Sequence, residues 1–391
     1  MLNSLLSPWP SFTEEESNAV SRVLLSNKVN YWTGIEGREF EKEFATFADS
    51  EYAVALANGT LALDLALKAL GIGAGDDVIV TPRTFLASVS SVVTAGASPI
   101  FADVDLNSQN ITAKSIERVL TPNTKAVIVV HLAGMPAEMD SIMALSKKHG
   151  FFVIEDCAQA HGAKYKGRSV GSIGHVGAWS FCQDKIMTTG GEGGMVTTND
   201  KQLWEKMWSY KDHGKSFDAV YNRDHPPGFR WLHESFGTNW RMTEIQAVIG
   251  RIQLTRMTEW SARRQYIAKQ LHRVIYDFQS LRAVEVPEYS VHAEYKHYFF
   301  VKPEFLVEGW TRDRIVDEMN KRGVPCFQGS CSEVYLEKAF DNTPWRPTER
   351  LPNAQELGET SLMMLVHPTL TDEEVEKSCS TLRAVIEMAT K

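Results

Sequence analysis

Short apolar runs alternate with helical segments along residues 52–156, and this alternation limits the possible folds more than any other feature. The predicted strands are residues 52–56, 78–80, 99–101, 126–130 and 151–154. Strands that alternate with helices are typical of a mainly parallel sheet covered by helices on both faces. The pattern therefore predicts an α/β fold.

The chain has 391 residues, which suits a large domain with a smaller one beside it. A helical pattern runs from about residue 237 to 273, and we place the domain boundary inside it. We expect a large domain over residues 1–260 and a small α+β domain over residues 261–391, with the N-terminal segment able to pack on the small domain. Residues 216–235, rich in aromatic residues, histidine and proline, predict a long loop or lid.

The composition disfavours several kinds of partner. The net charge of −8 leaves no basic excess for binding nucleic acid. No run approaches the ~18 apolar residues of a membrane helix, and the N-terminus shows no secretory signal. The five cysteines are scattered without a C-x-x-C pair, and the histidines lack metal-like spacing. We therefore expect a cytoplasmic protein that binds no nucleic acid, membrane or metal.

Two glycine-containing segments imitate nucleotide-binding motifs. Residues 162–169 resemble a P-loop, but Arg168 stands where lysine is required and no helix follows, so we interpret the segment as a turn. Residues 71–75 follow a helix and precede a strand, the reverse of the order in a dinucleotide-binding motif. These patterns disfavour ATPases and NAD-dependent dehydrogenases.

Polar residues stand at the ends of the predicted strands. Residues 58–60, His131, Asp156 and Lys185 each lie at or just after the end of an apolar run. In parallel sheets, ligands bind at the carboxyl ends of the strands, next to helix N-termini. We therefore expect these residues to gather on one rim.

The residues of this rim suit a single cofactor. The amine of Lys185 can form an imine with an aldehyde, and the carboxylate of Asp156 can hold a pyridine nitrogen protonated. Gly59 and Thr60 at a helix N-terminus can bind a phosphate, and Phe85 can stack on a ring. Each residue also has an ordinary structural alternative, such as a surface lysine, a helix cap or a core aromatic. Their coincidence on one rim favours the cofactor.

Longer motifs accompany these residues. They are residues 57–63 (ANGTLAL), 73–82 (GAGDDVIVTP), 84–88 (TFLAS), 101–104 (FADV), 130–134 (VHLAG), 155–160 (EDCAQA), 190–194 (GGEGG) and 239–247 (NWRMTEIQA). Together with Lys185 they resemble the DegT/DnrJ/StrS family of sugar aminotransferases, which depend on pyridoxal 5′-phosphate (PLP). The resemblance implies the fold-type I, aspartate aminotransferase-like architecture. Its large domain has a mainly parallel seven-stranded sheet sandwiched by helices, and a smaller C-terminal α+β domain follows.

The resemblance also implies roles for three residues around the cofactor ring. Lys185 matches the lysine that binds PLP covalently and then carries the proton. Asp156 matches the partner of the pyridine nitrogen, and Gln159 matches the group beside the phenolic oxygen.

Five further residues match cofactor contacts of the family. Gly59, Thr60 and Ser180 match contacts to the phosphate, and Phe85 matches the stacking aromatic. Asn239 matches a residue that reaches the phosphate from the neighbouring subunit. The resemblance therefore implies a homodimer with shared active sites.

Arg83, His131 and Arg230 are candidates for contact with the substrate. Arg83 stands beside the stacking aromatic, where the family has smaller residues, and a surface salt bridge is its alternative. Arg230 lies in the expected loop or lid. Gln183 and Asp184, directly before Lys185, are unusual for the family and carry no assigned role.

The resemblance implies a PLP-dependent aminotransferase that moves an amino group from L-glutamate to a keto-sugar, which is linked to a nucleotide. Such a product would serve the biosynthesis of a surface polysaccharide or a glycoside. Family members with histidine in place of the lysine dehydrate their substrates, so Lys185 favours amination. A PLP-dependent sugar dehydratase and a non-catalytic PLP-binding regulator remain as alternatives.

Overall fold

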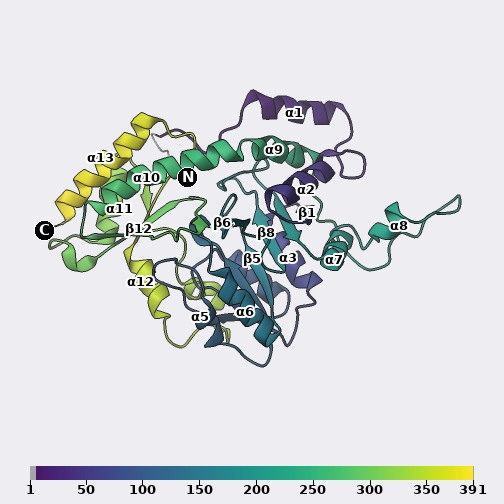
Figure 1. Ribbon diagram of the computed structural model, residues 1–391, viewed down its shortest axis with the longest axis horizontal. Coiled ribbons are helices and arrows are strands. Elements are labelled where there is room, and N and C mark those ends of the chain that lie inside the picture. Colours follow the sequence, from purple (N-terminus) through teal and green to yellow (C-terminus); the bar gives the residue numbers. More distant parts are fainter. Residues whose placement is uncertain (1–5, 391) are drawn as a thin grey trace.

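The computed structural model describes residues 6–390 and is built around a seven-stranded sheet (Figure 1). In spatial order the strands are β1 (Tyr52–Leu56), β9 (Gly194–Thr198), β8 (Val176–Ser180), β5 (Phe152–Asp156), β4 (Thr124–Val130), β2 (Asp77–Val80) and β3 (Ser98–Phe101). Only β9 runs against its neighbours, and the other pairs are parallel. The predicted α/β fold with a mainly parallel seven-stranded sheet is confirmed.

Successive strand residues point to opposite sides of this sheet, and apolar residues stand at both kinds of position. Helices therefore cover both faces. Ile128 and Ile154 pack in the core formed with α3 (Gly59–Ala69), α4 (Ala87–Thr94) and α7 (Lys201–Lys211). Their neighbours Val127 and Val153 pack on the other face, against α5 (Ala113–Glu117) and α6 (Met139–His149). The sheet is thus buried on both sides, which explains its nearly continuous apolar strands.

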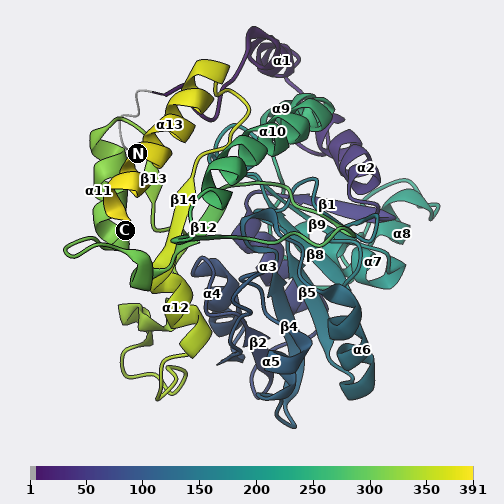
Figure 2. The same ribbon diagram turned by 60° about the vertical axis from the view of Figure 1, so that its left-hand side comes forward.

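A second core surrounds a four-stranded antiparallel sheet. Its strands are β10 (Leu281–Ala283), β12 (His297–Val301), β14 (Ser361–Met364) and β13 (Cys326–Phe327). The helices α10 (Met257–Tyr276), α11 (Arg312–Lys321) and α13 (Asp372–Ala389) pack on it (Figure 2). Leu6 lies in the same core, and the Ser7 N–H donates to Glu374 at 2.6 Å. The division of the chain at residue 260 stays a prediction.

The remaining elements lie around these two cores. They are α1 (Glu14–Leu25), α2 (Glu36–Phe47), α8 (Phe217–Tyr221), α9 (Glu244–Thr255), α12 (Pro352–Thr360), the short strands β6 (Lys164–Tyr165), β7 (Arg168–Ser169) and β11 (Ser290–Val291), and the 3₁₀ turns η1 (Leu132–Gly134), η2 (Pro303–Phe305), η3 (Val334–Leu336) and η4 (Lys338–Phe340). No helix within residues 6–390 is long and apolar enough to cross a membrane.

Two segments differ in detail from the expectations. The helical pattern over residues 237–273 forms two helices, α9 and α10, which meet at Arg256. The P-loop-like segment is a hairpin of β6 and β7, whose turn places Lys166 and Gly167 at positive φ, so the interpretation as a turn is confirmed.

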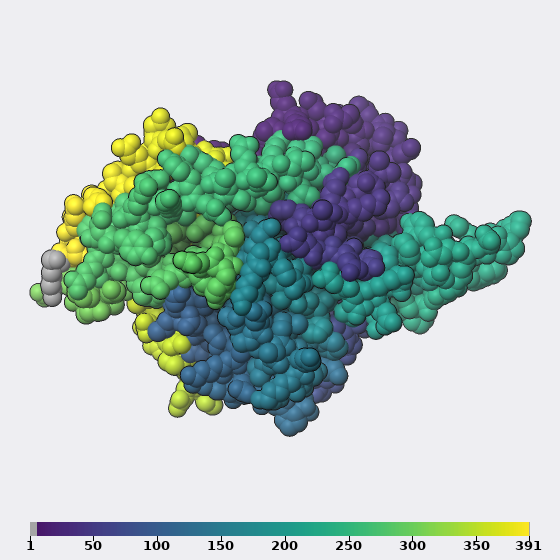
Figure 3. Space-filling model, in the orientation of Figure 1, coloured from purple at the N-terminus to yellow at the C-terminus, as the bar shows by residue number. Residues whose placement is uncertain are grey.

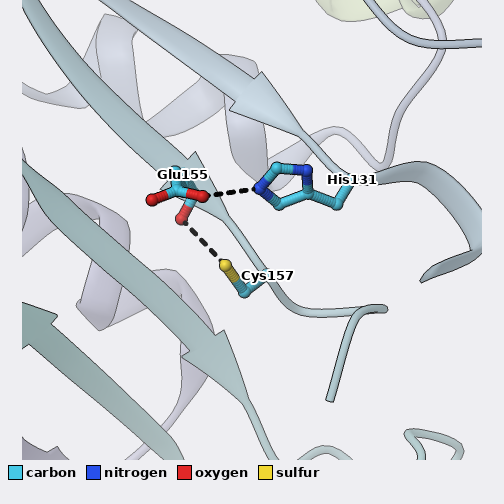
Figure 4. Close-up of side chains that lie close together, drawn as sticks. All are labelled: His131, Glu155 and Cys157. Carbon is cyan, nitrogen blue, oxygen red and sulfur yellow. Dashed lines mark hydrogen bonds and ion pairs between the residues drawn. The ribbon is translucent and has the colours of Figure 1, made fainter. Parts of the chain in front are cut away.

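Glu155, near the end of β5, holds the loop of residues 171–174 against the sheet. Its Oε2 accepts a hydrogen bond from Nε2 of His131 at 2.9 Å (Figure 4). It accepts a second one from the Gly171 N–H at 2.8 Å. Its Oε1 accepts from the N–H groups of Ile173 and Gly174. Burial by itself would raise the pKa of Glu155, but these hydrogen bonds outweigh it and lower the pKa below its ordinary value.

His131, Glu155 and Cys157 are the one group of described residues whose ligand atoms lie close enough together to hold a metal ion. Each is fully buried. Both ring nitrogens of His131 are used, because Nδ1 accepts from the Ala137 N–H at 3.0 Å. The Cys157 thiol donates to the Glu155 carbonyl (Figure 4). These bonds hold the strand ends together.

Replacing Glu155 should therefore destabilise the protein in a pH-dependent way. At neutral pH, Glu155→Gln should lower the free energy of unfolding by about 2–4 kcal/mol, because an amide cannot accept all four buried hydrogen bonds. The lowered pKa means that the contribution of the carboxylate is complete above the ordinary glutamate pKa of about 4.3 and is lost below it. The difference in free energy of unfolding between the wild type and Glu155→Gln should therefore become smaller as the pH falls. Urea unfolding at several pH values measures it. Glu117→Gln, at an exposed position, serves as the control, and equal stability at neutral pH would contradict the assignment.

Candidate active site

A cavity of about 630 Å³ opens at the carboxyl ends of β4, β5 and β8, beside the N-termini of α3 and α4. It brings together seven of the eight residues expected to bind the cofactor. They are Gly59, Thr60, Phe85, Asp156, Gln159, Ser180 and Lys185. The side chains come from segments far apart in sequence, and the parallel sheet unites them because its strands end at the same edge.

The first turn of α3 and the end of β8 form one side of the cavity. The Asn58 side chain caps the helix by accepting the Leu61 N–H at 3.0 Å. A Cβ atom added at Gly59 would lie 2.5 Å from Cβ of Ser180, so only glycine permits this approach. The helix N-terminus therefore meets the hydroxyl groups of Thr60 and Ser180, an arrangement suited to a phosphate.

Asp156 lies at the base of the cavity. Its Oδ2 accepts a hydrogen bond from the Ser88 hydroxyl at 2.8 Å, and its Oδ1 accepts from the Ala158 N–H at 3.1 Å. Burial raises the pKa of Asp156 above its ordinary value, against the lowering effects of Ser88, Ala158 and the nearby Lys185. A protonated ring nitrogen beside this carboxylate would offset the cost of burial.

Gln159 and Phe85 complete the surroundings of a bound ring. The Oε1 of Gln159 accepts the Ala133 N–H at 2.7 Å, so its Nε2 is left to donate toward the cavity. Phe85 is 71% exposed although it is a large apolar residue, and its ring borders the cavity. Such an exposed aromatic is suited to stacking on a ligand ring.

Lys185 follows the end of β8 and presents its amine to the same cavity. Its side chain is only 16% exposed, and its Nζ lies 3.7 Å from Oδ1 of Asp184 and 5.2 Å from the centre of the Tyr295 ring. The Lys185 carbonyl accepts a hydrogen bond from the indole of Trp9 at 2.8 Å. The backbone is therefore held while the amine remains available.

Two of the three substrate candidates lie away from the cavity. Arg83 is completely buried, and it donates two hydrogen bonds to Oε1 of Gln109 while its guanidinium lies over the Tyr298 ring. It is therefore not part of a surface salt bridge, and it does not line the cavity. His131 is also buried, with both ring nitrogens bonded inside the protein, so it does not reach the cavity.

Arg230 and Asn239 lie outside the cavity of their own subunit. Arg230 is exposed on the segment after α8, which projects away from the body of the protein (Figure 3), so this segment does not close over the cavity as a lid. Asn239 is exposed and pairs with Asp212 in an isolated β-bridge. Their expected roles stay predictions.

Two neighbours of the residues named from the sequence were not foreseen. Ser88, on the first turn of α4, bonds Asp156, and its position three residues after Phe85 could have indicated this. The Tyr295 hydroxyl donates to Oδ2 of Asp184. No local pattern could have indicated that contact, because Tyr295 belongs to a distant part of the chain.

These residues fit PLP at each of its functional groups. The α3 N-terminus with Thr60 and Ser180 would hold the phosphate, Asp156 the pyridine nitrogen, Gln159 the phenolic oxygen and Phe85 the ring face. When bound, PLP supplies an aldehyde for an amine and a ring that accepts electrons. Lys185 is the amine positioned to react with it.

Comparisons with known proteins agree with this geometry. The family model of the DegT/DnrJ/EryC1/StrS aminotransferase family matches residues 10–383. GDP-perosamine synthase from Escherichia coli O157:H7 is 34% identical over 95% of this chain and 96% of its own length. A crystal structure of an aminotransferase from Psychrobacter cryohalolentis is 64% identical, with a TM-score of 0.97, and covers 98% of this chain and 99% of its own.

A sugar aminotransferase from Streptococcus pneumoniae described as putative, solved in its PLP form, has a TM-score of 0.85 at 26% identity, over 98% of each chain. The same protein has been solved in its PMP form. The match covers nearly the whole chain and includes the cavity. This chain therefore belongs to the DegT/DnrJ/EryC1/StrS aminotransferase family, and its cofactor is PLP.

Proposed function

We propose that this protein transfers the amino group of L-glutamate to the keto group of a nucleotide-linked sugar, in the biosynthesis of a surface polysaccharide or a glycoside. The observation that carries the proposal is one cavity that unites the amine of Lys185, the carboxylate of Asp156 and the phosphate cradle of α3. The similarity to GDP-perosamine synthase, named for a nucleotide-linked amino sugar, supports the class of acceptor.

Each residue has a defined task in this reaction. Lys185 provides the nucleophile, and its Nζ takes up and returns a proton when it is free. Asp156, oriented by Ser88, keeps a proton on the ring nitrogen. Gly59, Thr60 and Ser180 anchor the phosphate, so that the reacting groups stay aligned through both half-reactions.

Lysine at position 185 favours amination over dehydration, since the dehydrating relatives are expected to carry histidine there. Incubation with keto-sugar nucleotides and L-glutamate distinguishes the two reactions. Formation of 2-oxoglutarate with an amino sugar supports amination, whereas loss of water without consumption of glutamate would support a dehydratase.

The active enzyme, in this proposal, is a homodimer with shared active sites. The segment after α8 projects from the body and exposes large apolar side chains: Phe229 is 74% exposed, Trp231 80% and Phe236 100% (Figure 3). Exposed aromatics of this kind mark interaction surfaces. Asn239, which lies near this segment and outside its own cavity, would reach the phosphate of the neighbouring subunit.

The five free cysteines fit a reducing compartment, which supports a cytoplasmic location.

Lys185→Ala should remove both covalent attachment of PLP and activity. We expect a loss of at least about 10³-fold in amino-sugar formation, because the variant lacks the nucleophile and the proton carrier. The measurements are the absorbance of bound PLP and mass spectrometry after borohydride reduction. Lys147→Ala, on the exposed part of α6, is the matched control. A Lys185→Ala enzyme with normal turnover would refute the proposal.

Shared sites predict complementation between two inactive variants. Lys185→Ala and Asn239→Ala, each inactive alone, should regain activity when their subunits are exchanged. Random exchange makes half of the dimers mixed, and each mixed dimer has one intact site, so about a quarter of wild-type activity should return. Size-exclusion chromatography with light scattering gives the oligomeric state. A monomer, or mixed dimers without recovery, would exclude shared sites.

A further inference from the structure

Asp184, directly before Lys185, places a carboxylate beside the reactive amine. Its Oδ1 lies 3.7 Å from Nζ of Lys185, and its Oδ2 accepts a hydrogen bond from the Tyr295 hydroxyl. The Lys185 amine also lies 5.2 Å from the centre of the Tyr295 ring. Asp184 and Tyr295 thus both lie close to the amine and are bonded to each other.

Tyr295 comes from the segment before β12, and this segment is anchored at the cofactor cavity. The Ala293 N–H donates to the Gly134 carbonyl and the Tyr295 N–H to the Ala133 carbonyl, both at 2.9 Å. Ala133 in turn donates to Gln159. A displacement of Tyr295 would therefore disturb the cavity itself, and the Asp184 carboxylate is held by a fixed donor.

Asp184 differs from the other titratable groups that face Lys185. The other groups are Asp156, Cys182, His161 and Lys296. Asp156 is assigned to the ring nitrogen. Burial raises the pKa of the Cys182 thiol and lowers the pKa of His161 to about 3, so both are neutral at physiological pH. Lys296 carries charge of the same sign as a protonated Lys185.

The protonation states of Asp184 and Tyr295 support a lasting interaction. Burial by itself would raise the pKa of Asp184, but Lys185 and the Tyr295 hydroxyl outweigh it and lower the pKa. Burial and the neighbouring Asp184 raise the pKa of Tyr295 well above its ordinary value. At neutral pH the tyrosine therefore donates and the aspartate remains an anion.

The ion pair does little for the stability of the fold, because the Asp184 side chain is 57% exposed. Its effect falls on Lys185, whose amine must alternate between neutral and protonated forms. In each half-reaction the free Nζ takes up one proton at one carbon and delivers it to another, so it is neutral before the transfer and protonated during it. Bound PLP would supply the ring that accepts the electrons left on the deprotonated carbon. A fixed anion at 3.7 Å favours the protonated form.

We propose that Asp184, oriented by Tyr295, is a positioning residue that holds the free Lys185 amine at the cavity and stabilises its protonated form during proton transfer. The proposal rests on the assignment of Lys185 as the cofactor-binding lysine. It gives a role to a residue that the motifs of the family leave unassigned.

The test uses the PLP-loaded enzyme and a single-turnover half-reaction with L-glutamate, followed over a range of pH. We expect Asp184→Asn to react about tenfold more slowly and the pH profile of this rate to move to lower pH, because the anion at 3.7 Å is removed. The isotope effect with α-deuterated glutamate should increase, because proton transfer becomes slower. The rate of Tyr295→Phe should lie between those of the wild type and Asp184→Asn. Asp184→Glu should recover part of the rate that Asp184→Asn loses. Asp313→Asn, an exposed carboxylate of α11, is the matched control.

Asp184→Asn with the wild-type rate, pH profile and isotope effect would overturn the inference. A slower variant with an unchanged pH profile and isotope effect, not rescued by glutamate, would also overturn it, since it would indicate a purely structural role. Borohydride reduction and peptide mass spectrometry separate this result from failure of the proposed function. Wild-type protein without PLP on Lys185 would refute the proposed function, whereas attachment with unaltered kinetics in the variant would refute the inference alone.

Discussion

The end of strand β5 carries two adjacent buried carboxylates that point to opposite sides of the sheet, and the active site depends on this separation. Glu155 is saturated by backbone N–H groups and by His131 (Figure 4). Among residues 6–390, Asp156 accepts hydrogen bonds only from Ser88 and Ala158, and it faces the cavity. One acid therefore fixes the framework while its neighbour remains available to a ligand. If the carboxylate in the cavity had the four hydrogen bonds of Glu155, its pKa would be lowered. It would then bind a proton on a ring nitrogen less strongly than Asp156 can.

Close backbone approach supports the same arrangement from the other side. A Cβ at Gly59 would collide with Ser180, and a Cβ at Gly194 would lie 2.2 Å from the Asn58 carbonyl. The N-terminus of α3 can therefore lie against β8 and β9 only where these side chains are absent. The result is a helix N-terminus, two hydroxyl groups and Lys185 within one cavity. Its shape is set by packing of the backbone, and the chemistry is then supplied by a few side chains.

Much of this site could be predicted because its residues stand at the ends of strands. Lys185, Asp156, Gly59 and Thr60 each follow an apolar run, and a parallel sheet gathers such positions at one edge. The same reasoning was wrong for His131, which also follows a strand. Its ring turns into the protein to bond Glu155 and Ala137, and no sequence pattern specifies that direction. Arg83 was misjudged for a similar reason, because burial of a guanidinium against Gln109 and Tyr298 depends on contacts between distant segments.

The sequence by itself determined the alternating elements, the parallel sheet and the identity of the amine and acid at its edge, because these follow from apolar periodicity and from the order of strands along the chain. Only the tertiary structure decided which polar side chains face the cavity and which are consumed by internal hydrogen bonds. It also decided that Tyr295 meets Asp184, since the two residues are 111 positions apart and are joined only when the segment before β12 packs on the large sheet. Local patterns carry no information about such contacts, because they arise from the packing of whole elements against one another.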